Sequence, residues 1–269
     1  MPGIRLKPRM PLAPFIECLW YWEGAPGPHR QERLMPQAQP ALIFNLRDDP
    51  IAIYEDGRPP ASFGTAVFSG ARATCFTIDC HQQERALGIQ FASGGAAPFF
   101  SMPVSAMEDG CFSLSDLWGR DADHIRTRVL AAPTPHGRLR ALETCLQERI
   151  TLGRLQPEIA WMAAALDRSD SPQVQDVAAQ IGMSRRRLTQ LFHEQVGLSP
   201  KTFHRVRRFQ HTLQRLQRVR AVHWAEVAVA CGYYDQAHLT NDFRRIAGMT
   251  PSAYLAAATE HLNHVPLPD

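Results

Sequence analysis

The pattern of apolar and polar residues differs between the two halves of the chain. Up to about residue 110, short apolar runs alternate with turn residues, a pattern that favours short strands over helices. Six runs predict strands: FIECLWYWEG, PALIFNLRDD, IAIYEDG, TAVFSGAR, ATCFTIDC and RALGIQFASGG. Strands at roughly this spacing are typical of a small barrel or sandwich.

The segment 104–155 connects the two halves of the chain. In LRALETCLQERI, Leu139, Leu142, Leu146 and Ile150 fall on one helical face, with charged residues opposite. That face could pack on its own domain or on a second protomer. The pattern therefore predicts connector helices and leaves a homodimer open.

The second half of the chain contains an internal repeat. QDVAAQIGMSRRRLTQLFHEQVGLSPKTF (175–203) matches AEVAVACGYYDQAHLTNDFRRIAGMTPSAY (225–254). Each copy has a short amphipathic helix, then Gly182 or Gly232 where the chain must turn left-handed. Ser184 and Asp235 follow as N-caps of a second helix. We therefore predict two helix–turn–helix units, at about 174–195 and 224–246.

A long helix is predicted between these units. In KTFHRVRRFQHTLQRL (201–216), Phe203, Val206, Phe209 and Leu213 lie along one stripe. Sixteen residues span about 24 Å at about 1.5 Å per residue. With the width of the flanking helices, we expect the second helices of the two units to lie roughly 34 Å apart, about one turn of DNA.

Composition and charge sharpen this picture. The 269 residues suit two domains of roughly 100–200 residues each. Between Arg185 and Arg220, ten basic residues face only one acidic residue, Glu194, so this stretch carries +9 and attracts a polyanion. No apolar run approaches the roughly 20 residues of a membrane helix, so no membrane partner is expected. The N-terminus lacks the apolar core of a secretory signal, and six cysteines without a Cys-x-x-Cys pair indicate reduced thiols in a cytoplasm.

Residues from about 157 to 260 resemble the DNA-binding domain of AraC/XylS-type transcription regulators. The second copy carries the resemblance, with its G-Y-x-D-Q-x-H-L run followed by Phe243, Gly248, Thr250-Pro251 and Tyr254. The resemblance implies a sequence-specific regulator, not an enzyme, whose two units bind double-stranded promoter DNA. RNA polymerase is a further partner that this role allows.

The same resemblance assigns candidate DNA contacts by position. Six residues would read base edges: Arg186, Thr189, Gln190, Gln236, Thr240 and Asn241. Six would hold the backbone: Ser184, Arg187, Lys201, Arg205, Arg244 and Arg245. Family members often have arginine where Asn241 stands. Because asparagine prefers adenine and arginine prefers guanine, the second half-site cannot be carried over.

The N-terminal half resembles the β-rich sensor domains that precede such DNA-binding domains. L-x-P-x-x-x-P-x-L-I-F-N-L (Leu34–Leu46) and F-x-x-G-G-A-A-x-F-F (Phe91–Phe100) carry this resemblance. Ser93-Gly94-Gly95-Ala96-Ala97 is interpreted as opening a helix that runs to Phe100. The resemblance implies a small-molecule effector but names neither the ligand nor its binding residues.

The sequence of the N-terminal half shows no cluster of residues typical of a catalytic site. His29, His81, His124 and His136 are isolated in sequence, so no catalytic residue, cofactor or metal is expected. Cys75 and Cys80 are interpreted as buried structural thiols, with a redox switch or methyl acceptor as alternatives. An enzyme tethered to DNA and a nonspecific or partner-docking DNA-binding protein remain rival interpretations.

The sequence thus predicts an α+β two-domain fold. Residues 1–155 would form a small β-barrel or sandwich with connector helices, serving effector binding or dimerisation. Residues 156–262 would form an all-α domain of two helix–turn–helix units joined by a long helix. Residues 263–269 would be a C-terminal tail.

Overall fold

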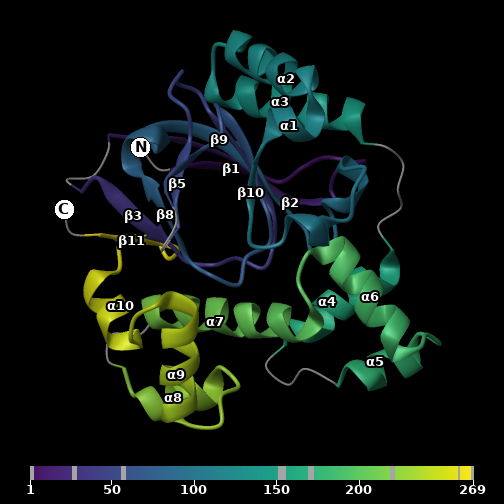
Figure 1. Cartoon of the computed structure of the whole chain (residues 1–269), viewed down its shortest axis with the longest axis vertical. Helices are drawn as coiled ribbons and strands as arrows, with labels where there is room; N and C mark the ends of the chain where they lie inside the picture. The colour runs from purple at the N-terminus through teal and green to yellow at the C-terminus, as the bar shows by residue number, and fades with distance from the viewer. Residues whose placement is uncertain are drawn as a thin grey trace.

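A domain of two β-sheets is followed by a helical domain built along one long helix (Figure 1). This computed structural model describes residues 3–25, 29–55, 59–150, 156–168, 173–218, 222–259 and 261–267. The α+β fold class and the β-rich character of the N-terminal half are confirmed.

The first sheet has the order β1-β2-β9-β4-β7-β10, and each neighbouring pair is antiparallel. Its strands are β1 (Ile4–Leu6), β2 (Ile16–Glu23), β9 (Arg85–Phe91), β4 (Ala41–Asn45), β7 (Ala66–Ser69) and β10 (Cys111–Ser113). Gly88 of β9 is required here, because a Cβ at this position would lie 2.0 Å from the carbonyl oxygen of Leu42. The absence of a side chain at Gly88 lets the Trp20 ring lie across β9.

The second sheet has the order β11-β3-β8-β5-β6 and is also antiparallel. Its strands are β11 (His264–Pro266), β3 (Gln31–Leu34), β8 (Phe76–Asp79), β5 (Ala52–Tyr54) and β6 (Ala61–Ser62). All six strands predicted from the sequence are present. The short strands β1, β3, β6, β10 and β11 were not predicted, because their two to four residues lie outside the apolar runs that marked the other strands.

Three connector helices cover the first sheet on the side away from the helical domain (Figure 1). They are α1 (Leu114–Trp118), α2 (Arg120–Ala131) and α3 (Pro135–Arg149). Leu139, Leu142 and Leu146 are fully buried in the same core as Phe44 and Leu87, and Ile150 packs against it. The apolar face of α3 therefore packs on its own domain. The helix expected to run to Phe100 is only a short 3-10 turn, Ala97–Phe99.

The helical domain has the predicted architecture of two units on one long helix. Its helices are α4 (Pro157–Leu166), α5 (Val174–Gln180), α6 (Arg185–Val196), α7 (Pro200–Arg218), α8 (Trp224–Ala230), α9 (Gln236–Ala247) and α10 (Pro251–Ala257). Figure 1 shows α7 running beneath the β domain, with α5 and α6 at one end and α8 and α9 at the other.

The two halves of the chain share their cores. The core of the first unit includes Ala38, Ala71 and Ala73 from the β domain, and the core of the second includes Met35 and Val265. A buried hydrogen bond, 2.6 Å long, runs from Gln210 Nε2 on α7 to the carbonyl oxygen of Pro36. The helical domain is therefore packed directly on the β domain along the length of α7.

The predicted boundary near residue 155 falls on residues 151–155, which lie outside the described residues, and it stays a prediction. Strand β11 lies in the segment expected to form a C-terminal tail. It pairs with β3, with Val265 opposite Arg33. After the helical domain, the chain thus returns to the second sheet.

Candidate DNA-binding interface

The first helix–turn–helix unit consists of α5 and α6. Gly182 adopts a positive φ of 67° at the turn, as expected of the glycine after a helix. The Ser184 hydroxyl accepts a hydrogen bond from the Arg187 backbone N–H at 3.2 Å and so caps α6. Because Leu188, Leu191 and Phe192 are buried, the opposite face of α6 is left for solvent.

The second unit consists of α8 and α9 and repeats this construction. Gly232 has a φ of 75°, and Asp235 Oδ1 accepts from the His238 backbone N–H at 2.7 Å. Leu239, Phe243 and Ile246 form the buried stripe of α9. The predicted caps, turns and inward stripes of both units are therefore confirmed.

The second unit is tied to α7 by polar contacts as well as by its core. Arg208 on α7 donates to Asp242 on α9 at 2.8 Å, and both side chains are largely buried. The Arg208 guanidinium also lies over the Tyr233 ring, 4.1 Å from its centroid. Burial raises the pKa of the Tyr233 hydroxyl to about 12, so this ring stays neutral. Together these contacts fix the orientation of α9 on the long helix.

The residues predicted to read bases divide evenly between the outer faces of α6 and α9. Four are exposed: Arg186, Gln190, Gln236 and Asn241. Thr189 and Thr240 are half-buried beside them. On α6 these side chains border a shallow hollow of about 440 Å³ lined by Arg185, Arg186, Thr189, Gln190, His193 and Ser199. The fold thus gathers each predicted set on one surface.

The residues predicted to hold the DNA backbone flank these faces. Five are exposed, namely Ser184, Arg187, Lys201, Arg244 and Arg245, and Arg205 is half-buried. Lys201 and Arg205 lie on the first turns of α7, directly after α6. Arg220, the last member of the basic stretch, lies outside the described residues.

The inner end of α6 is anchored on the β domain. His193 Nε2 lies 2.9 Å from Glu108 Oε2. A Cβ at Gly197, which ends α6 with a φ of 93°, would lie 3.1 Å from Val104 Cγ1 of the β domain. No local pattern predicts this contact, because Val104 and Glu108 are brought to α6 only by the course of the chain between β9 and β10.

A cavity of about 550 Å³ lies between the two halves of the chain. The β domain contributes residues such as Lys7, Glu17 and Ser93, and α4 and α7 contribute Ala163 and Arg207. Arg207 also reaches Gln39 Oε1 of the β domain at 3.2 Å. Sequence reasoning missed this cavity because its walls come from separate segments, at 7–17, 39, 92–93, 160–167 and 203–207, that only the fold brings together.

The two cysteines of interest lie at either end of β8. The Cys75 thiol is half-buried rather than buried as predicted, because it lies at the edge of the second unit, where it donates to the carbonyl oxygen of Ile246, on the last turn of α9, at 3.0 Å. Cys80 is buried, as predicted, and burial together with the nearby Glu32 charge raises the pKa of its thiol to about 12. Cys75 therefore contacts the second unit, while Cys80 belongs to the β domain.

Comparison with known proteins agrees with this architecture. Residues 177–257, from α5 to α10, match the family described as "Helix-turn-helix domain", and residues 4–113 match a domain of unknown function, DUF6597. No curated protein sequence matches the chain.

Several solved structures are similar to parts or most of the chain. A transcriptional regulator with an AraC-type DNA-binding domain from Chromobacterium violaceum has 23% identity, covering 39% of this chain and 95% of that one, with a TM-score of 0.36. A DNA-binding transcriptional dual regulator from Escherichia coli K-12 has 24% identity, with coverages of 39% and 95% and a TM-score of 0.33. ToxT from Vibrio cholerae has 9% identity over 88% of this chain and 96% of its own, with a TM-score of 0.47.

The family match spans both helix–turn–helix units, whose signature residues stand at the caps, turns and buried stripes described above. Among the described residues, no helix is long and apolar enough to cross a membrane. The chain thus carries a helix–turn–helix domain behind a β-rich N-terminal domain that matches a family of unknown function.

Proposed function

We propose that this chain is a transcription regulator of the AraC/XylS type that binds specific promoter sites by placing α6 and α9 in two successive major-groove segments. The observation that carries the proposal is the pair of capped helices on α7, each with an exposed outer face of arginine, glutamine, asparagine and threonine. These side chains form the hydrogen bonds that distinguish base edges in the major groove.

The two helices would read different bases. On α6, Arg186 would favour guanine and Gln190 adenine, with Thr189 beside them. On α9, Gln236 and Asn241 would both favour adenine, with Thr240 between them. An asymmetric site follows, because the two faces carry different side chains.

Contacts to phosphates would set register and affinity. Ser184 and Arg187 would act at the start of α6, Lys201 and Arg205 at the start of α7, and Arg244 and Arg245 on the last turns of α9. Such contacts hold the protein on the duplex without selecting sequence. The rival interpretation, a nonspecific or partner-docking protein, would rely on these contacts alone.

Selection of bound fragments from random DNA, followed by variant binding at fixed salt, tests the proposal. Arg186→Ala should weaken binding to the selected site by about 1–3 kcal/mol and relax preference at one base position. Lys201→Ala should weaken all duplexes alike and lower the salt slope by about one. Arg120→Ala, an exposed arginine on α2, is the control and should change neither. Equal affinity of the wild type for selected and random duplexes would favour the nonspecific rival.

We further propose that a small-molecule effector acts through the cavity between the β domain and helices α4 and α7. A ligand there would contact both halves and could favour one arrangement of the units over another, which is what coupling to DNA affinity requires. Ala160→Trp, which fills the cavity from α4, should abolish the response of DNA binding to any effector found by screening metabolites. An unchanged response would place the effector elsewhere.

The remaining parts of the proposal concern partners and location. Regulation of promoters places the protein in the cytoplasm, with RNA polymerase as a partner and a homodimer as one functional form. The rival of a DNA-tethered enzyme would need free acid–base groups, whereas Arg207 and Asp167 at the interdomain cavity are paired with each other at 2.7 Å.

A further inference from the structure

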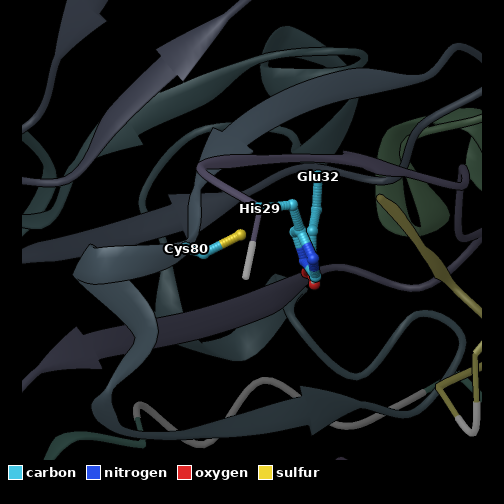
Figure 2. Close-up of side chains that lie close together, drawn as sticks. All are labelled: His29, Glu32 and Cys80. Atoms are coloured by element: carbon cyan, nitrogen blue, oxygen red, sulfur yellow. The ribbon is translucent and has the colours of Figure 1, made fainter. Parts of the chain in front are cut away.

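Three metal-binding side chains that are separate in sequence come together at the second sheet. His29 precedes β3, Glu32 lies in β3, and Cys80 follows β8. Antiparallel pairing of β3 with β8 sets Glu32 opposite Ile78, two residues before Cys80. One ligand atom from each side chain lies within 4.8 Å of the other two. Figure 2 shows the Cys80 sulfur directed toward the His29 and Glu32 side chains.

The spacing of these atoms suits a small divalent cation. Zinc binds sulfur at about 2.3 Å and nitrogen or oxygen at about 2.0–2.2 Å, so the donors of a tetrahedral site lie roughly 3.5 Å apart. His29 Nε2 and Glu32 Oε1 are now hydrogen-bonded at 2.7 Å and would separate slightly. Bringing ligand atoms that now lie up to 4.8 Å apart to this spacing requires about 1 Å of side-chain movement. Thiolate, imidazole and carboxylate together favour zinc over magnesium or calcium, which prefer oxygen donors.

The backbone and neighbours around the three side chains are already held in place. The Cys80 backbone N–H donates to the carbonyl oxygen of Arg30 at 2.9 Å, which fixes the end of β8 beside β3. The second oxygen of Glu32 lies 2.7 Å from His264 Nδ1, on β11. An outer partner of this kind orients a ligating carboxylate. The side chains of His29 and Glu32 are 18% and 17% exposed, so an ion could reach them from solvent.

A hydrogen-bonded cluster without metal is the simpler account of His29 and Glu32. Burial opposes ionisation of Glu32, but hydrogen bonds with His264 and His29 outweigh it and lower the pKa of its carboxyl to about 2. In that account the Cys80 thiol is only a hydrogen-bond partner of Glu32, whereas a metal ion would use its sulfur as a ligand.

We propose that His29, Glu32 and Cys80 bind one zinc-type divalent cation, with His264 as the outer partner of Glu32 and a water molecule in the fourth position. On binding, the sulfur–metal bond forms as the Cys80 thiol releases its proton to solvent. The ion links β3 to the end of β8 and, through His264, to the strand that follows the DNA-binding domain. This site does not depend on the proposed DNA-reading residues.

Metal binding to the full-length, tag-free, reduced and chelator-stripped protein tests the proposal. Calorimetry with Zn²⁺ should give one ion per chain, and Co²⁺ should give a thiolate-to-metal charge-transfer band with the strong visible absorption of a tetrahedral site. Zn²⁺ should also raise the Tm of the wild type, since a ligand of the native state stabilises it. Loss of the second-sphere histidine in His264→Gln should weaken binding by about 10–100-fold.

Matched variants decide whether the named side chains form the site. Cys80→Ser should abolish the charge-transfer band and the rise in Tm, and Glu32→Gln should abolish the rise in Tm while keeping the side-chain shape. His81→Gln, next to Cys80 but 62% exposed, and Cys75→Ser, at the other end of β8, should bind like the wild type. The two ligand variants are independent, so a folding defect in one leaves the other to decide. No saturable binding by the wild type, or an unchanged cobalt spectrum in Cys80→Ser, would overturn the proposal.

Discussion

The cap of the second recognition helix offers a direct test of how local structure supports DNA reading. Asp235 is exposed and adopts an extended backbone, and its carboxylate accepts from the His238 backbone N–H at 2.7 Å. His238 Nδ1 lies 3.4 Å from the Tyr234 backbone N–H in return. Gln236, a predicted base reader, is the first residue of the turn that these two hydrogen bonds close.

The expected loss of stability on replacing Asp235 has two separable contributions. Replacing a capping Asp by alanine costs about 1 kcal/mol through the lost hydrogen bond. Loss of the negative charge at the helix N-terminus costs a further 0.3–1 kcal/mol, roughly. Asparagine caps as well as aspartate but has no charge, so Asp235→Asn should lose only the second contribution. Asp235→Ala should therefore be less stable than Asp235→Asn by about 1 kcal/mol.

Urea unfolding and DNA binding measure the two variants side by side. Both remove the same repulsion from DNA phosphates, so their difference isolates the cap. If the bound state needs the first turn of α9 intact, Asp235→Ala should bind the selected duplex up to about fivefold more weakly than Asp235→Asn, the equivalent of about 1 kcal/mol. Equal stability of the two variants would refute the capping role, and equal affinity would show that the first turn does not contribute to reading.

Two further predictions concern the packing of the helical domain. A left-handed backbone costs an alanine about 1–2 kcal/mol at either Gly182 or Gly197. Only Gly197→Ala also brings its Cβ close to Val104, whereas the Cβ of Gly182→Ala meets nothing within 4 Å, so the unfolding free energy of Gly197→Ala should fall further. Equal losses in urea unfolding would show that Val104 moves aside at no cost. Burial opposes ionisation of Asp167, but hydrogen bonds with His211 and Arg207 outweigh it and lower its pKa to about 2. The carboxylate therefore stabilises the fold above about pH 4, and this contribution is lost as the pH falls toward 2. The difference in unfolding free energy between the wild type and Asp167→Asn should shrink across that window, and an unchanged difference would contradict the lowered pKa.

Local rules in the sequence were enough to predict the helical domain. Gly182, Gly232, Ser184 and Asp235 act within a few residues of their own helices, so their roles can be read without tertiary information. Each helix also has one buried stripe, and the 3.6-residue period of that stripe leaves the opposite face exposed. The predicted DNA-reading residues fall on those exposed faces for this reason.

Contacts between distant segments had no such local signal. His29 looked isolated and Cys80 was interpreted as a structural thiol, and only the pairing of β3 with β8 brings Cys80 to His29 and Glu32. Likewise, nothing near Val265 in sequence indicates that it pairs with Arg33 on β3 and packs in the core of the second unit. Strand order and interdomain packing depend on which apolar surfaces are buried against each other over the whole chain, and that choice is made only when the chain folds as one body.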